Sequence, residues 1–142
     1  MQSRAEASLA CVLGVPTVDG MGGPWQIEYY VDEVGRAPFR RWVDGLPALQ
    51  ARLVWKAVAD ELTMRGPDVC ADHWGRNLGG GLYECRIRRQ HVVLRVFFCT
   101  NHGRVVVLLG GFDKGSQPKR QAAAIAVARQ RLADYRRRID SL

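Results

Sequence analysis

The stretch Leu-Gly-Gly-Gly-Leu-Tyr-Glu-Cys-Arg-Ile-Arg, residues 78–88, decides the fold of this chain. Its three glycines predict a tight turn, because glycine adopts positive φ angles at little steric cost. The residues after the turn alternate between apolar and charged side chains, which is typical of a β-strand with one buried face. A second β-prone run, residues 91–99, follows at once. Together the two runs predict a β-hairpin.

The hairpin sorts its side chains onto two faces, because neighbouring residues of a strand point in opposite directions. With a two-residue turn at Arg89-Gln90, Glu84 lies across from Arg95, and Arg86 is a diagonal neighbour. One face is then wholly apolar and consists of Tyr83, Cys85, Ile87, Val92, Leu94, Val96 and Phe98. The other face carries Glu84 and three arginines, the third being Arg88. We expect the apolar face to form core and the cationic face to carry the function.

The segments around the hairpin complete an α+β domain. A β-prone run over residues 25–31, a short helix opened by Pro38 and a longer helix over residues 48–64 precede the hairpin. After it, residues 104–109 predict a strand that is covered on both sides. Pro118 opens a final helix with the apolar stripe Ile125, Ala128, Leu132, Tyr135 and Ile139. We therefore expect a small, twisted, mainly antiparallel sheet with two N-terminal helices and a C-terminal helix.

The composition, 47% hydrophobic and 25% charged over 142 residues, is that of one soluble domain. Because residues 17–24 are rich in glycine, we expect residues 1–23 to be a flexible extension and residues 24–142 to be the domain. Met21 is an alternative start of the protein. No stretch approaches the ~20 apolar residues of a membrane-spanning helix, and the apolar run over residues 9–15 is too short for a signal peptide.

The cysteines and histidines do not indicate a metal site. The four cysteines form no C-x-x-C pair and are Cys11, Cys70, Cys85 and Cys99. The three histidines have no metal-ligand spacing with them. We therefore expect no metal and no cofactor, and we interpret the cysteines on strands as small core residues. Unpaired cysteines are typical of a reducing compartment, so we expect a cytoplasmic location.

The charged residues are distributed unevenly along the chain. Residues 76–142 contain 14 of the 21 Lys and Arg residues but only 4 of the 14 Asp and Glu residues. The net charge of +7 therefore rests on the second half of the chain, whereas residues 1–75 are slightly acidic. A basic half indicates a polyanionic partner, and nucleic acid is the first candidate. The alternative is that many of the arginines form a solvated helix surface.

Three motifs occur in a recognisable order and spacing. They are residues 78–88, then Leu-Arg-Val-Phe-Phe over residues 94–98, and then Gly-Phe-x-Lys before Gln-Pro-Lys-Arg at residues 117–120. Over about residues 25–138 the chain resembles the RelE/HigB toxins, in particular their phage-derived HigB-like branch. The resemblance implies a RelE-like fold and the toxin component of a type II toxin–antitoxin system. Such toxins inhibit growth as metal-independent endoribonucleases, which cleave mRNA on the ribosome or free mRNA and leave a 2′,3′-cyclic phosphate.

The resemblance also implies partners and roles for particular residues. A cognate helix-turn-helix antitoxin would cover the basic cleft in a toxin–antitoxin hetero-oligomer. Arg95 matches the position of the usual catalytic arginine, and Arg86 matches a position that supports it. A guanidinium suits this role because it stays charged and binds phosphate oxygens through two N–H groups. His73 is the candidate general base, since its intrinsic pKa is suitable and relatives often carry Lys or His there; a plain loop residue is the alternative. RNA contacts are expected from Lys114, Lys119, Arg88 and Arg120.

The chain also departs from the family pattern, and these departures keep other functions open. Lys114 is followed by Gly115 instead of a second lysine, and Leu94 and Phe98 stand where tyrosines are usual. The missing hydroxyls leave open a decayed toxin that acts as a non-catalytic nucleic-acid-binding or interaction module. A ParE-like inhibitor of DNA gyrase, which shares this fold, is a further alternative. The Arg86/Arg95 pair favours nuclease chemistry over gyrase inhibition.

Overall fold

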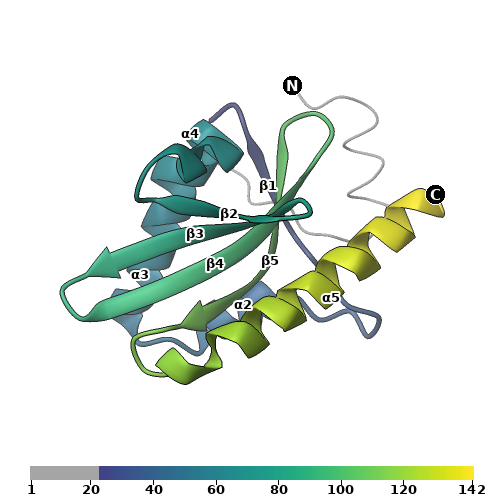
Figure 1. Ribbon diagram of the computed structural model, residues 1–142. Helices are drawn as coiled ribbons and strands as arrows, with labels where there is room; N and C mark the ends of the chain where they lie inside the picture. The colour runs from purple at the N-terminus through teal and green to yellow at the C-terminus, as the bar shows by residue number, and fades with distance from the viewer. Residues whose placement is uncertain (1–22) are drawn as a thin grey trace.

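The computed structural model describes residues 23–142, so the extension expected over residues 1–23 lies outside the described residues apart from Gly23. Five strands form one sheet in the order β1-β5-β4-β3-β2 (Figure 1). The strands are β1 (Gln26–Tyr29), β2 (Gly75–Gly79), β3 (Leu82–Arg89), β4 (Val92–Asn101) and β5 (Val105–Asp113). Only the pairing of β1 with β5 is parallel in this sheet. The predicted α+β fold with a mainly antiparallel sheet is therefore confirmed.

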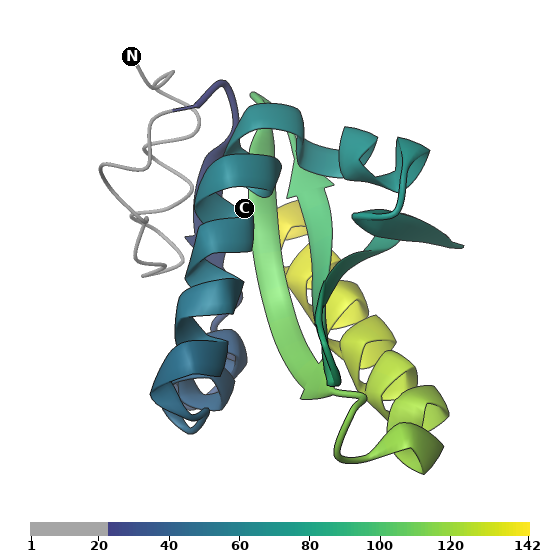
Figure 2. The same cartoon turned by 90° about the vertical axis from the view of Figure 1, so that its left-hand side faces the viewer.

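Helices cover both faces of the sheet (Figure 2). On one side lie α2 (Pro38–Asp44), α3 (Ala48–Ala57), a π-helical turn η1 (Val58–Leu62) and the short α4 (Thr63–Arg65), followed by the 3₁₀-helix η2 (Gly66–Ala71). On the other side the 3₁₀ turn η3 (Pro118–Arg120) leads into α5 (Gln121–Asp140), which crosses the sheet. Pro38 and Pro118 begin their helices as predicted, because a proline in the first turn needs no N–H partner. In the described part of the chain, no helix is both long and apolar enough to cross a membrane.

Each face of the sheet has its own hydrophobic core. The apolar face of the hairpin packs with Phe39, Val54 and Val58 from the helices α2, α3 and η1. On the opposite face, the predicted stripe of α5 packs onto the sheet through its buried members Ala128, Leu132 and Tyr135. Cys85 and Cys99 are buried in these two cores, as predicted for cysteines on strands. Strand β5 lies between both cores, which confirms the prediction of a strand covered on both sides.

The register of the β3–β4 hairpin differs from the predicted register. Arg89 pairs with Val92, so the turn is Gln90-His91 and not Arg89-Gln90. Gln90 takes up a positive φ of 54°, which lets the turn close one residue later. Arg86 consequently lies opposite Arg95, and Glu84 is the diagonal neighbour of that arginine. Because the shift is by two residues, every side chain stays on the face that the alternation assigned to it.

The sheet has one strand more than the sequence predicted. Residues 75–79, which we expected to be part of a loop, form the edge strand β2 and pair with the first half of β3. Two glycines in five residues weaken the β signal of this segment. The turn that follows requires glycine, because Gly79, Gly80 and Gly81 all have positive φ. Arg129 of α5 donates hydrogen bonds to the carbonyl oxygens of Leu78 and Gly79, which fastens this turn to the helix.

Candidate functional site

A hollow of about 250 Å³ lies beside the β3–β4 hairpin, and we call it the arginine hollow. It is lined by His73, Trp74, Arg86, Arg88 and Arg95. The structure therefore brings together four residues that the sequence singled out, namely the two candidate phosphate-binding arginines, the candidate base and one candidate RNA contact. Trp74 is the fifth lining residue, and sequence reasoning missed it. In Figure 1 the tip of this hairpin projects beyond α5, so the helix leaves this end of the face open.

The sheet register explains why these side chains meet. Arg86 of β3 and Arg95 of β4 are directly opposed, and directly opposed residues of antiparallel strands project from the same face. On the other side of β3, the backbone N–H of Arg86 donates to the carbonyl oxygen of Trp74 at 2.8 Å. Trp74, in the turn just before β2, therefore extends the row formed by the two arginines. A row of this kind is rigid, because each member is fixed by the backbone hydrogen bonds of the sheet.

A buried carboxylate holds two of the arginines. Glu84 is 0% exposed, and its Oε1 lies 3.3 Å from Arg95 Nε. These two atoms do not meet the geometry of a hydrogen bond, so the attraction between them is electrostatic. Arg86 Nε donates to the other carboxylate oxygen, Oε2, at 3.3 Å. Since a buried charge needs a partner, Glu84 and Arg95 stabilise each other in the interior.

The electrostatics of the arginine hollow favour an anion. Three guanidinium groups face one carboxylate there, which leaves an excess of positive charge. Burial lowers the pKa of Arg95 despite the attraction of Glu84, and the neighbouring charges of Arg86 and Arg88 lower it further. Arg95 is only 4% exposed and forms the floor, whereas the Arg86 side chain is 34% exposed and Arg88 is exposed at the mouth. A bound anion would relieve the repulsion among these cations.

The rim of the hollow beside β2 is formed by His73 and Trp74. Their ring centroids are 5.5 Å apart, and the His73 side chain is exposed. Asp72 accepts hydrogen bonds from the backbone N–H of Trp74 at 2.9 Å and from Arg65 Nη1 at 2.7 Å. The hydrogen bond from Arg65 also lowers the pKa of the Asp72 carboxyl group. These contacts hold the segment in place although it has no regular secondary structure.

The other predicted RNA contacts do not line the arginine hollow. Lys114 is half-buried directly after β5, where the N–H of Gly115 donates to the carbonyl oxygen of Val93 on β4. Lys119 and Arg120 are exposed on η3, at the beginning of the last helix. Within residues 23–142, no three His, Cys, Asp or Glu side chains are grouped so that they could hold a metal ion.

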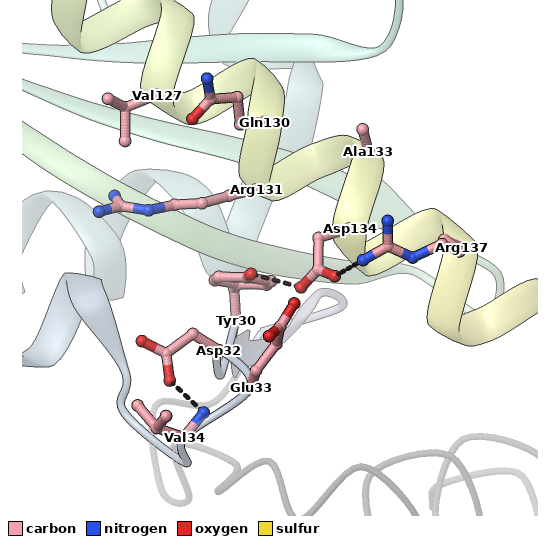
Figure 3. A pocket seen from close by; sticks show the side chains of 10 residues that line it. All are labelled: Tyr30, Asp32, Glu33, Val34, Val127, Gln130, Arg131, Ala133, Asp134 and Arg137. Carbon is pink, nitrogen blue, oxygen red and sulfur yellow. Dashed lines mark hydrogen bonds and ion pairs between the residues drawn. The ribbon is translucent and has the colours of Figure 1, made fainter.

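A second, wider hollow of about 580 Å³ lies between α5 and the segment after β1, and we call it the α5 groove (Figure 3). Its lining consists of Tyr30, Asp32, Glu33, Val34, Val127, Gln130, Arg131, Ala133, Asp134 and Arg137. Tyr30 donates to Asp134 Oδ2 at 2.5 Å, and the same carboxylate pairs with Arg137 and Arg138. Sequence reasoning gave no signal for this groove, because its two walls lie about a hundred residues apart in the chain.

Comparison with known proteins identifies a family. Residues 41–133 match the family described as phage-derived protein Gp49-like (DUF891), a family of RelE/ParE-like toxins. The match covers well over half of the chain and includes both strands that carry the arginines of the hollow. No curated protein matches the chain. A toxin of this kind implies an antitoxin as its partner.

Proposed function

Since this chain belongs to the Gp49-like family of RelE/ParE-like toxins, we propose that it is the toxin component of a type II toxin–antitoxin system and cleaves mRNA. The observation that carries the proposal is the arginine hollow, where Arg86, Arg88 and Arg95 converge beside His73 with only one carboxylate to balance them. Excess guanidinium charge in a rigid cleft suits a phosphodiester, which stays anionic and gains negative charge as it reacts.

Cleavage would proceed by attack of a ribose 2′-oxygen on the adjacent phosphorus. His73 would accept the proton of the 2′-hydroxyl, because a histidine is the side chain best suited to take up a proton near neutral pH. The new P–O2′ bond replaces the P–O5′ bond, which gives a 2′,3′-cyclic phosphate and a free 5′-hydroxyl end. Arg86 and Arg88 would hold the phosphate oxygens at the mouth, and Arg95 would stabilise the developing charge from the floor.

The remaining basic residues do not line the hollow but would act on RNA that is bound in it. Lys114 follows the strand that pairs with β4, and it would contact the RNA and donate a proton to the departing 5′-oxygen. Lys119 and Arg120, both exposed on η3, would contact flanking phosphates or the ribosome. A helix-turn-helix antitoxin would silence the toxin by covering this basic surface. Its binding segment would carry acidic groups that compete with RNA for the arginines.

One observation favours a second candidate, which is RNA binding without cleavage. Arg95 is 4% exposed and already paired with Glu84, so its guanidinium is less available to a substrate than that of Arg86. If Arg95 serves only to neutralise a buried carboxylate, the hollow would bind a phosphate through Arg86 and Arg88 but accelerate its reaction little. Both candidate functions involve binding of RNA, but only cleavage produces new RNA ends. Mapping of the 5′ ends of mRNA therefore distinguishes them.

The test is induced expression of the wild type and of Arg95→Ala, with growth and the 5′ ends of mRNA recorded together. Because Arg95→Ala removes a buried charge, Arg86→Ala serves as a second variant with a more exposed side chain, and circular dichroism checks the fold of both. The matched control is Arg137→Ala, which removes an arginine of the α5 groove. We expect growth arrest with codon-phased 5′-hydroxyl ends in the wild type and the control, and neither in the two hollow variants.

Other outcomes would point elsewhere. Growth arrest without new RNA ends would contradict cleavage and would favour binding alone or inhibition of DNA gyrase. The absence of arrest with a folded wild-type protein would mean that the toxin has decayed.

A further inference from the structure

The arginine hollow contains an aromatic ring that the cleavage chemistry does not use. Trp74 lines the hollow together with the three arginines, and it also packs against the hydrophobic core that contains Phe39 and Val54. On the basis of the proposed function, we propose that Trp74 is a stacking site for one unpaired RNA base next to the phosphate held by the arginines. The hollow would then bind one nucleotide through two contacts, with the base stacked on the ring of Trp74 and the phosphate paired with the arginines.

The position of Trp74 is fixed before any ligand arrives. Its backbone N–H donates to Asp72 at 2.9 Å, and its carbonyl oxygen accepts the N–H of Arg86 at 2.8 Å. Packing against the core fixes the half-buried ring as well. A ring that is already ordered loses little entropy when a base stacks on it, so it is a better platform than a mobile side chain.

Trp74 differs from the other tryptophans of the described chain in its surroundings. Trp42 and Trp55 lie in an aromatic cluster around Phe39, on the side of the sheet that α2 and α3 cover. Trp25 also packs against that core. Trp74 is the described tryptophan that borders the cations of the hollow. A cationic cleft that also presents an aromatic face is typical of proteins that bind single-stranded nucleic acid.

The arrangement requires a single-stranded ligand. In a duplex the base stacks on its neighbours and pairs with the other strand, so its face cannot reach a side chain. The row Trp74–Arg86–Arg95 would hold a base at one end and a phosphate at the other, with the ribose between them. His73 precedes Trp74 in the chain and lies on the same rim, which is the place where it could reach the 2′-hydroxyl of that ribose.

The experiment measures how the wild type, Trp74→Leu, Trp74→Phe and Arg95→Ala bind a short single-stranded RNA. The RNA carries a fluorescent label and 2′-O-methyl groups that prevent cleavage, and it is offered free and as the message of a programmed ribosome. The same RNA is also prepared with one base removed at each position in turn. The matched control is Trp42→Leu, which alters another half-buried tryptophan that packs against the same core but does not line the hollow. Thermal unfolding checks that each variant is folded.

We expect Trp74→Leu to weaken binding of the intact RNA about tenfold or more, and Trp74→Phe to weaken it less, because phenylalanine keeps an aromatic face. Removal of the base at one position of the RNA should weaken binding by the wild type about as much as Trp74→Leu weakens binding of the intact RNA. Trp74→Leu should lose no further affinity when that base is removed, since the base and the ring would be partners in one contact. Trp42→Leu should respond to every abasic position as the wild type does.

Two results would overturn the stacking site in different ways. In the first, Arg95→Ala weakens binding, but Trp74→Leu either binds every RNA as the wild type does or loses the same factor of affinity for the intact RNA and for each abasic RNA. The ring would then contact no base, while the proposed function would stand. If the wild type binds the RNA neither free nor on the ribosome, the stacking site and the proposed function fail together.

Discussion

The two hollows of this molecule contain the same kinds of charged groups in different proportions. The arginine hollow is lined by three guanidinium groups, of which Arg86 and Arg95 share the carboxylate of Glu84, and Arg95 Nε forms no hydrogen bond. In the α5 groove, Asp134 alone accepts from Tyr30 and pairs with two arginines, while two further carboxylates stand nearby. The arginine hollow therefore has an excess of positive side chains, whereas the positive and negative side chains of the α5 groove neutralise each other. This difference suggests ligand binding at the first site and fold stability at the second.

Removal of the main carboxylate of each hollow, Glu84 or Asp134, should reveal the largest difference between them, which is a difference in stability. Glu84→Ala leaves the buried guanidinium of Arg95 without its partner, and we expect the free energy of unfolding to fall by about 3–5 kcal/mol. Asp134→Ala should cost clearly less, because water can solvate the side chain of Arg137, which is 71% exposed. Urea unfolding of both variants measures the difference. Equal losses would show that the two carboxylates are structurally equivalent.

Truncation of an arginine in each hollow should reveal a difference in RNA cleavage, with little difference in stability. Arg86→Ala should lower the rate of RNA cleavage by about a hundredfold or more, because it removes a cation that faces the reacting phosphate. The partly exposed ion pair that it loses is worth about 1 kcal/mol or less in stability. Arg137→Ala, the control from the α5 groove, should leave cleavage unchanged. Cleavage assays with purified protein and programmed ribosomes compare the two, and an equal loss in both would contradict a localised site.

The salt dependence of RNA binding offers a finer comparison. If Arg88 at the mouth of the hollow contacts one phosphate, Arg88→Gln should reduce the slope of log affinity against log salt concentration by about 0.7. The corresponding change in the α5 groove, Arg137→Gln, should leave the slope as it is. Titrations at several salt concentrations measure both slopes. An unchanged slope in Arg88→Gln would place the RNA elsewhere on the basic surface.

The smallest expected effect concerns acid stability. Burial by itself raises the pKa of Asp134, but hydrogen bonds from Tyr30 and Arg138 outweigh it and hold this pKa below the usual 3.8. A lowered pKa in the folded protein stabilises the fold above pH 3.8, and this stability is lost as the pH falls through the folded pKa. The unfolding free energy of Asp134→Asn should therefore decline less steeply below pH 3.8 than that of the wild type. Parallel declines would mean that the α5 groove does not depend on this charge.

The sequence was sufficient to predict the sides of the hairpin but not its register. The alternation from Tyr83 to Arg88 assigns each side chain to a face, and that assignment survives a shift of two residues. The position of the turn could not be predicted in this way, because Gln90-His91 lacks the Asn-Gly or Asp-Gly signal of a two-residue turn.

The composition of the site was only partly predictable. The three arginines were identified through motifs, and His73 through its side-chain chemistry and the residues that relatives carry there. Trp74 was missed because it precedes a strand whose two glycines weaken the β signal. Glu84 is completely buried, since β2 pairs alongside it and α5, which is distant in the chain, packs on this face of the sheet. No local pattern in the sequence reports such coverage, so the burial of the Glu84–Arg95 pair could not be predicted.

The parallel pairing of β1 has a consequence for the order in which the chain can fold during synthesis. Gln26 lies beside Val105, 79 positions later, whereas β2, β3 and β4 each pair with the next strand along the chain. Contacts between distant segments form late, because a long loop must close before they stabilise anything. We therefore expect the nascent meander of β3, β4 and β5 to assemble first and to serve as the template for β1. The first strand to leave the ribosome would be the last to find its place, which hydrogen exchange on stalled nascent chains can follow.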